Sequence, residues 1–143
     1  MSEVINIKYL SDVPEIKKIV VGDWVDLSAA EDVFLNEGES TIIKLGVAMQ
    51  LPDGFEALLA PRSSTFKKYG IIQTNSVGVI DETYCGDNDE WGLPVYATRF
   101  IHIPKHTRIC QFRIIEHQPT LEFRKVQTLG NKNRGGFGST GEK

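Results

Sequence analysis

Hydrophobic residues occur in short runs along the chain, and turn-forming residues separate the runs. The clearest runs are 41–50, 55–60, 71–74, 93–98, 108–116 and 121–127. Short apolar runs between Gly, Pro, Asn and Asp are typical of β-strands in a barrel or sandwich. β-branched residues support the same interpretation, because 14 Ile, 11 Val and 9 Thr stand against 6 Ala. We therefore predict an all-β barrel or sandwich.

Two local patterns refine this prediction. Pro52-Asp53-Gly54 combines a preset φ at proline with glycine's access to positive φ, so we expect a turn there and antiparallel pairing of the strands on either side. Residues 63–69 have the polar start and the length of one short helix, which Gly70 would end. We expect no other helix of consequence.

The end of the chain differs in composition from the rest. Residues 130–143 contain five glycines and a single large apolar residue, Phe137. Such a segment buries too little surface to offset its ordering entropy. We therefore predict a β-domain over 1–129 and a flexible arm over 130–143. The arm is either a frayed tail or a segment that becomes ordered on a ligand.

Length and charge narrow the class of partner. The chain has 143 residues, 41% of them hydrophobic and 24% charged, which indicates one globular domain. Its net charge is -3, but residues 1–60 hold 4 basic and 11 acidic side chains, whereas residues 61–143 hold 12 and 8. The negative total argues against a nucleic-acid polymer as partner. The basic second half still permits a pocket for a small polyanion.

The sequence also indicates a compartment. No apolar run approaches the roughly 18 residues of a membrane span, and the first residues lack the pattern of a signal peptide. We expect a cytoplasmic protein with no membrane partner. Cys85 and Cys110 lie far apart without a C-x-x-C pair, so we expect both to be reduced thiols.

Polar residues that could carry chemistry occur in four segments. Pro61-Arg62-Ser63-Ser64 follows an apolar strand and precedes the predicted helix. Main-chain N–H groups, serine hydroxyls and a guanidinium would together suit phosphate oxygens. An ordinary N-cap serine beside a solvated arginine is an equal alternative.

The second segment, 75–86, places an amide, a carboxylate and an aromatic ring within ten positions. Asn75 would read a polar ring edge, Asp81 would polarise a water, and Tyr84 would offer a flat face to a sugar. Each also has a plain structural alternative: an Asx-turn for Asn75, a turn carboxylate for Asp81 and a half-buried core residue for Tyr84.

The remaining two segments lie later in the chain. In the strand 108–113, alternation places Arg108, Cys110 and Phe112 on one face, and Gln111 and Arg113 on the other. The segment 134–141 is rich in glycine but lacks the P-loop pattern. It could order on a ligand through Arg134, the hydroxyls of Ser139 and Thr140, and a stacked Phe137.

With the segment around Asp26, these four segments resemble the five ordered motifs of the homotrimeric dUTP pyrophosphatases, or dUTPases. The resemblance runs from about Gly22 to Gly141 and keeps the order and spacing of the motifs. It implies a β jelly-roll protomer, a homotrimer with active sites at subunit interfaces, and an arm that closes over a site. The activity implied is hydrolysis of dUTP to dUMP and pyrophosphate, which limits uracil in DNA and supplies dUMP for thymidylate synthesis.

The resemblance also implies a role for each site residue. Asp81 would deprotonate the water that attacks the α-phosphate, and Asn75 and Tyr84 would recognise uracil and deoxyribose. Mg²⁺ would bind through substrate phosphates and waters, with no direct protein ligand. The other predicted substrate-binding residues are Arg62, Ser63, Ser64, Gly78, Ile80, Gln111, Arg134, Phe137, Gly138, Ser139 and Thr140. Asp26, Arg108 and Trp91 would have supporting roles.

Departures from the family pattern keep some alternatives open. The loop 87–92 is long and resembles Gram-positive bacterial and prophage members, so Trp91 is a second candidate for the base-covering ring assigned to Phe137. A dCTP deaminase shares the fold and the Arg-Ser-Ser turn, but the chain offers no clear deaminating glutamate. A phage-type regulatory module would instead bind a protein, with the 87–92 loop as the candidate contact.

Overall fold

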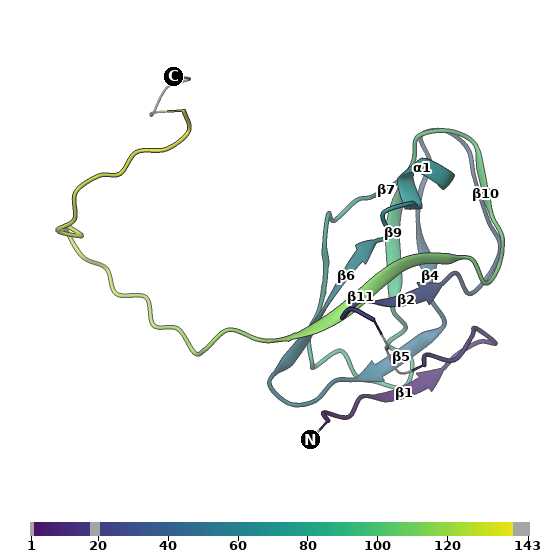
Figure 1. Cartoon of the computed structure of the whole chain (residues 1–143), viewed down its shortest axis with the longest axis horizontal. Helices are drawn as coiled ribbons and strands as arrows, with labels where there is room; N and C mark the ends of the chain where they lie inside the picture. Colours follow the sequence, from purple (N-terminus) through teal and green to yellow (C-terminus); the bar gives the residue numbers. More distant parts are fainter. Residues whose placement is uncertain (1, 18–20, 139–143) are drawn as a thin grey trace.

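The computed structural model describes residues 2–17 and 21–138, which form a β body and a long C-terminal arm (Figure 1). The elements are β1 (Asn6–Tyr9), β2 (Val25–Ser28), β3 (Val33–Leu35), β4 (Ser40–Lys44), β5 (Val47–Gln50), β6 (Phe55–Pro61), α1 (Thr65–Tyr69), β7 (Ile71–Gln73), β8 (Gly78–Ile80), β9 (Gly92–Ala97), β10 (Ile101–Ile103) and β11 (Arg108–Glu116). The predicted all-β class is confirmed. The short helix is also confirmed, and it ends at Gly70 with φ 62°.

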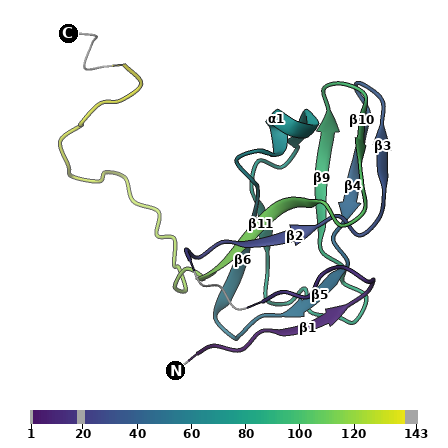
Figure 2. The same cartoon turned by 45° about the vertical axis from the view of Figure 1, so that its right-hand side comes forward.

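The strands form one four-stranded sheet and smaller sheets around it. The large sheet has the order β2-β11-β6-β8, and a second sheet has the order β4-β9-β7. Two ribbons, β1-β5 and β3-β10, complete the body, and Figure 2 shows them at its lower and right-hand edges. The pairing of strands distant in the sequence is typical of jelly-roll folds.

One hydrophobic core fills the space between these sheets. Its fully buried side chains come mainly from β4, β5, β6, β9, β10 and β11 and include Ile43, Leu59, Leu93, Ile103 and Ile109. Cys110 is buried in this core and Cys85 is exposed, and both are free thiols as predicted. Burial raises the pKa of the Cys110 thiol, with a smaller contribution from the negative charge of Asp26. A neutral buried thiol packs as a small hydrophobic residue.

Two of the strand predictions were wrong. The turn at Pro52–Gly54 forms, and Gly54 has φ 86°, but β5 pairs with β1 while β6 pairs with β11 and β8. The turn is therefore a corner between sheets instead of a hairpin. The run 121–127 forms no strand, because no other described strand lies beside it and its side chains stay exposed.

The predicted alternation of side chains along β11 was also wrong at one position. Cys110 and Phe112 are buried on one face, as predicted, but Arg108 is exposed and does not share that face. Against β2, Arg108 pairs with Ser28 and Cys110 pairs with Leu27, so Ile109 is an extra residue in a β-bulge. A bulge of one residue shifts the alternation and turns the preceding side chain to the other face. This shift brings Arg108 toward Asp26.

The arm leaves the body after β11 and runs away from the sheets (Figures 1 and 2). Residues 117–138 form no helix or strand and are exposed throughout. The segment without regular structure thus begins at His117, well before the glycine-rich residues. Within the described ranges, no helix is long and apolar enough to cross a membrane.

Candidate functional site

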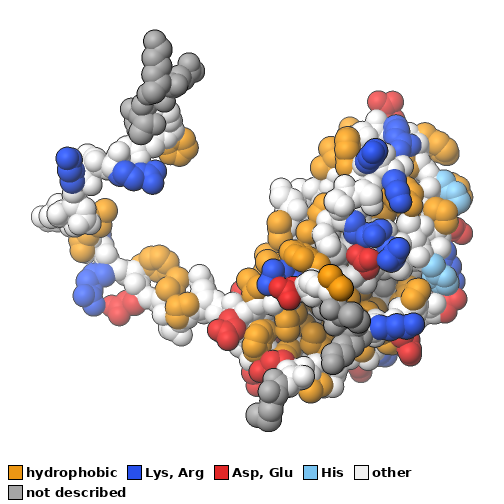
Figure 3. Space-filling view, in the orientation of Figure 1, with side chains coloured by type: hydrophobic (Ala, Val, Ile, Leu, Met, Phe, Trp, Pro, Cys, Tyr) orange, Lys and Arg blue, Asp and Glu red, His pale blue; other side chains and the backbone are white. Residues whose placement is uncertain are grey.

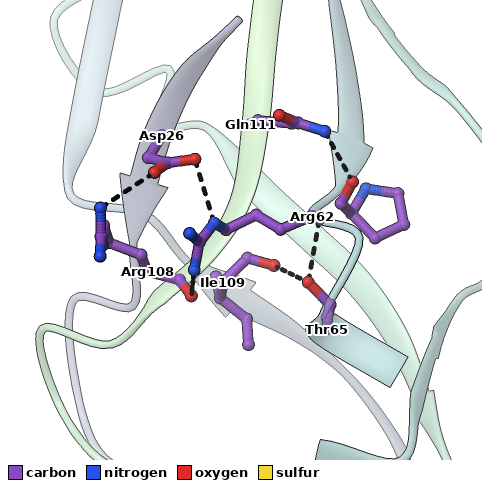
Figure 4. A network of polar contacts seen from close by, with 7 residues as sticks. Asp26, Arg62, Thr65, Arg108, Ile109 and Gln111 are labelled. Atoms are coloured by element: carbon purple, nitrogen blue, oxygen red, sulfur yellow. Dashed lines mark hydrogen bonds and ion pairs between the residues drawn. The ribbon is translucent and has the colours of Figure 1, made fainter. Parts of the chain in front are cut away.

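Three charged side chains meet at one edge of the large sheet, and we call them the arginine cluster (Asp26 in β2, Arg108 at the start of β11 and Arg62 directly after β6). Arg62 Nε lies 3.1 Å from Asp26 Oδ1, and Arg108 Nη1 lies 3.3 Å from Asp26 Oδ2. The carboxylate thus bridges two guanidinium groups that would otherwise repel each other (Figure 4). This arrangement fixes two cations near one another, with Arg108 more exposed than Arg62.

Main-chain contacts hold the arginine cluster in place. Thr65 is 3% exposed. Its Oγ1 accepts a hydrogen bond from Arg62 N at 2.9 Å and donates one to Ile109 O at 3.0 Å. Gln111 lies beside Asp26 in the β11–β2 register and donates from Nε2 to Pro61 O at 3.1 Å. These bonds connect the end of β6 to β11 and so position Arg62 (Figure 4).

The two serines of the same segment lie just before α1. Ser64 occupies the N-cap position but makes no side-chain capping hydrogen bond, so the ordinary capping role offered for it is absent. Ser63 is exposed and Ser64 is half-buried. On the face of the body shown in Figure 3, basic side chains gather between α1 and the β2–β11 edge. A small anion would find hydroxyl donors and positive charge together here.

A second site lies between the turn that joins β7 to β8 and the loop that precedes β9. We call it the hairpin pocket, although β7 pairs with β9 and β8 pairs with β6. It has a volume of about 530 Å³. Six of the residues predicted from the sequence line it: Asn75, Gly78, Ile80, Asp81, Tyr84 and Trp91. They come from one stretch of chain that the pairing of β8 with β6 folds over Leu59. The candidate groups that would bind a ring, Asn75 and Tyr84, and the candidate general base, Asp81, therefore share one pocket.

The turn at the tip of the hairpin pocket is tightly constrained. Val77 N donates to Asn75 O at 2.6 Å, and the intervening Ser76 has φ 60°. This combination is a γ-turn with positive φ at a residue other than glycine, a conformation that costs energy. Gly78 follows, and a Cβ atom there would lie 3.2 Å from Leu59 Cβ. The absence of a side chain at Gly78 thus lets the turn approach β6 closely.

Asp81 and Tyr84 are each oriented by one hydrogen bond. Asp81 Oδ1 accepts from Thr83 N at 2.9 Å, which leaves Oδ2 of this exposed residue without a partner among the described residues. Tyr84 Oη donates to Glu90 O at 2.9 Å, and the ring remains 42% exposed. Both side chains thus combine a fixed orientation with an accessible functional surface.

Trp91 is placed differently from the other aromatic candidates. It is 1% exposed and packs edge-on against Phe112, with 5.2 Å between ring centroids. A ring held in the core in this way is not placed to cover a base, so the suggestion that Trp91 takes this role does not fit the structure. Trp91 instead forms part of the pocket floor.

The arginine cluster and Asp81 lie at opposite ends of β6 within one chain. Arg62 follows Pro61, whereas Asp81 follows Ile80, which pairs with Ala57. The four residue steps from Ala57 to Pro61 span about 13 Å of extended strand. Asp81 therefore lies apart from the arginine cluster of its own chain, and none of the three cluster residues lines the hairpin pocket.

Among the described residues of the arm, Arg134, Phe137 and Gly138 are not part of either site. Arg134 donates from Nε to the neighbouring Gly135 O at 3.1 Å, and Phe137 is fully exposed. Gly138 has φ 84° and open space around it. Ser139 and Thr140 lie outside the described residues. The arm is drawn well away from the body (Figure 1).

Sequence reasoning missed three residues that position the candidate groups. Thr65 fixes the Arg62 main chain, Gln73 contacts Asn75, and Glu90 supplies the acceptor for Tyr84. Thr65 and Gln73 also donate to main-chain carbonyls in β11 and β6, Ile109 O and Leu59 O. No residue pattern in the sequence marks such contacts, although an isolated Gln at a buried strand position is a weak signal.

The family model described as dUTPase matches residues 25–141. The SPbeta prophage-derived deoxyuridine 5'-triphosphate nucleotidohydrolase YosS of Bacillus subtilis (strain 168) is 55% identical over 140 residues, which cover 97% of this chain and 99% of the relative.

Solved structures of phage proteins share the fold. A dUTPase variant of Staphylococcus bacteriophage 80alpha with dUpNHpp has a TM-score of 0.81 at 23% identity, and the match covers 99% of this chain and 100% of that one. A mutant dUTPase from phage phi11 of S. aureus, described with a structural Mg(II) ion, has a TM-score of 0.74 at 20% identity over 88% of this chain and 98% of that one.

Proposed function

The chain belongs to the dUTPase family, and we propose that it hydrolyses dUTP to dUMP and pyrophosphate through attack of water on the α-phosphate. The observation that carries the proposal is the hairpin pocket, where Asn75, Asp81 and Tyr84 converge. The 55% identical relative is named for this substrate. The biological consequence would be less uracil in DNA and a supply of dUMP, in the cytoplasm.

Asp81 is the proposed general base. Its Oδ1 is held by Thr83 N, so Oδ2 is available to accept a proton from the attacking water. Exposure of this side chain lets water reach it. A placed general base contributes typically about 10²- to 10⁴-fold to a rate.

The nucleoside would bind in the hairpin pocket. Asn75 and the main chain at Gly78 and Ile80 would face the uracil edge, while Tyr84 would pack against deoxyribose. The hydrogen bond from Tyr84 Oη to Glu90 O holds the ring in one orientation. A 2′-hydroxyl would then meet the ring face and lose its hydrogen bonds to water, which disfavours ribonucleotides.

The phosphates would bind to Arg62, Ser63, Ser64 and Gln111, with Asp26 and Arg108 in support. Ile80, the residue before Asp81, pairs with Ala57, about 13 Å along β6 from Pro61, so a site that spans Asp81 and the arginine cluster favours contributions from two copies. We therefore propose a homotrimer with active sites between subunits. Arg134, Phe137, Gly138, Ser139 and Thr140 of an arm would close over such a site.

Magnesium is the proposed cofactor, and it would arrive with the triphosphate. Mg²⁺ keeps several waters and takes few carboxylates, and the described residues hold no group of three or more His, Cys, Asp or Glu side chains. Asp26 is already paired with two arginines. The carboxylates of the described residues therefore fit a Mg²⁺ ion that is bound mainly through phosphate oxygens and water. When bound, Mg²⁺ would neutralise charge on the leaving pyrophosphate.

The test is the release of pyrophosphate from a panel of nucleotides. We expect dUTP to be the preferred substrate, with dTTP, dCTP and UTP poor ones. Assays with and without Mg²⁺ test the cofactor, and sedimentation tests the trimer. Release of ammonia from dCTP would instead identify a deaminase and overturn the proposal.

A further inference from the structure

Gln73, the last residue of β7, is a buried amide side chain in contact with the hairpin pocket. It is 6% exposed. Its Nε2 donates to two oxygens, Leu59 O at 3.0 Å and Asn75 Oδ1 at 2.9 Å. Gln73 thus ties the side chain of Asn75 to the main chain of β6.

One main-chain carbonyl determines the orientation of both amides. Leu59 O can only accept, so the Gln73 atom that faces it must be the nitrogen. The same nitrogen also faces Asn75, so the Asn75 atom opposite it must be the oxygen. Asn75 Nδ2 is therefore turned away from Gln73, and it would lie 3.5 Å from a Cβ atom placed on Gly78. Asn75 thus presents a hydrogen-bond donor on the side that faces away from Gln73.

The cost of burying Gln73 indicates what it contributes. Its Oε1 is buried and has no hydrogen-bond partner among the described residues, and an unpaired buried oxygen destabilises a fold. A methionine would fill a similar space without this cost. What the glutamine supplies in exchange is the pair of donated hydrogen bonds that hold Asn75.

We propose that Gln73 is a positioning residue that fixes the Asn75 amide with its donor toward the base, and thereby sets the discrimination between uracil and cytosine. This proposal rests on the proposed function. Uracil carries an acceptor oxygen at the position where cytosine carries a donor amino group. An unrestrained asparagine would flip and accept from that amino group. An asparagine held by Gln73 leaves the amino group unpaired.

A double-mutant cycle tests whether Gln73 acts through Asn75. Wild type, Gln73→Met, Asn75→Ala and the double variant are compared by kcat/KM for dUTP and dCTP, with pyrophosphate as the readout. We expect Gln73→Met to lower the dUTP-to-dCTP ratio by roughly tenfold, the size expected for one hydrogen bond. In the Asn75→Ala background the same change should alter the ratio by less than about twofold.

An unchanged ratio in Gln73→Met, or an equal loss in both backgrounds, would overturn the proposal. These outcomes are distinct from failure of the proposed function, in which the wild type itself would release no pyrophosphate from dUTP. A thermal melt of each variant shows whether it is folded under the assay conditions.

A measurement on the unmodified chain applies even if Gln73→Met does not fold. Exchange of the glutamine side-chain amide protons with solvent is followed by NMR. We expect the Gln73 Nε2 protons to exchange at least about tenfold more slowly than those of the exposed Gln118 and Gln127. Equal exchange rates would show that the hydrogen bonds to Leu59 and Asn75 do not persist, and would overturn the proposal.

Discussion

Arg62 Nε lies 3.1 Å from Asp26 Oδ1, so a cation proposed to bind phosphate is already paired with an acidic side chain. The two side chains are 27% and 30% exposed. A pair so accessible to solvent contributes little to stability. Its importance lies in holding the guanidinium in one place before the substrate arrives.

Replacing Asp26 by asparagine should therefore impair activity more than stability. We expect Asp26→Asn to lower kcat for dUTP by about tenfold, because Arg62 and Arg108 lose their common anchor. The free energy of unfolding should change by less than about 1 kcal/mol. Asp23→Asn is the matched control, since Asp23 forms a similar pair with Arg113 at 3.4 Å. Unchanged kcat in Asp26→Asn would contradict this role.

Thr65 offers a prediction about stability. Thr65→Val keeps the shape of the side chain but removes both bonds of Oγ1, which leaves Arg62 N and Ile109 O without that partner. We expect a loss of about 1–3 kcal/mol in the free energy of unfolding, measured with denaturant. Thr65→Ser retains the hydroxyl and should lose clearly less. Equal losses in the two variants would show that packing, not hydrogen bonding, is what Thr65 contributes.

His117, where the arm leaves the body, should make stability depend on pH. Its pKa is raised above the ordinary 6.5, first by the hydrogen bond to Gln118 O and also by the charges of Glu82 and Glu56. A raised pKa means that the folded state favours the protonated ring. The stabilisation is complete below pH 6.5 and is lost as the pH rises through the folded-state pKa.

Thermal unfolding of wild type and His117→Gln at about pH 5.5, below the ordinary pKa, and at about pH 9 measures this dependence. The melting temperature of wild type should exceed that of the variant at the lower pH, and the difference should shrink at the higher pH. A difference that grows as the pH rises would reverse the sign and contradict the assignment. Glu82 also accepts from Gly54 N at 2.8 Å, so it should not be replaced in this test.

Removal of the arm after Leu129 should separate catalysis from folding. Residues 130–138 make only local hydrogen bonds in the described part of the chain, so the body should keep its melting temperature and its oligomeric state. Turnover of dUTP should fall on the order of 100-fold, because the closing groups are gone. Full activity of the truncated chain would restore the interpretation of the arm as a frayed tail.

The hydrophobic runs predicted β4, β5, β6, β7, β9 and β11 but missed β1, β2, β3, β8 and β10, and strand pairing was also predicted poorly. The run 108–116 coincides with β11, and the predicted helix ends at Gly70 as expected. The turn at Pro52–Gly54 was predicted, yet its flanking strands join different sheets. Turn chemistry is local, whereas pairing depends on contacts such as Glu82 with Gly54, which lie 28 residues apart.

The same distinction applies to the candidate site. Asn75, Asp81 and Tyr84 could be predicted as a group because one short stretch of chain carries them. The bulge at Ile109 could not, since it depends on the register between β11 and β2. Gln73 escaped notice because its partners are a main-chain carbonyl of β6 and one neighbouring amide. Contacts of this kind can be found only once the three-dimensional structure is known.

The most direct test of the proposed mechanism is the rate of pyrophosphate release from dUTP by Asp81→Asn, with Mg²⁺ present. The substituted amide would keep an oxygen for Thr83 N but could not take a proton from water. We expect kcat to fall at least about 100-fold, with KM nearly unchanged. Asp53→Asn, at an exposed turn outside the pocket, should match wild type. A kcat for Asp81→Asn equal to that of wild type would contradict the assignment of Asp81 as the general base.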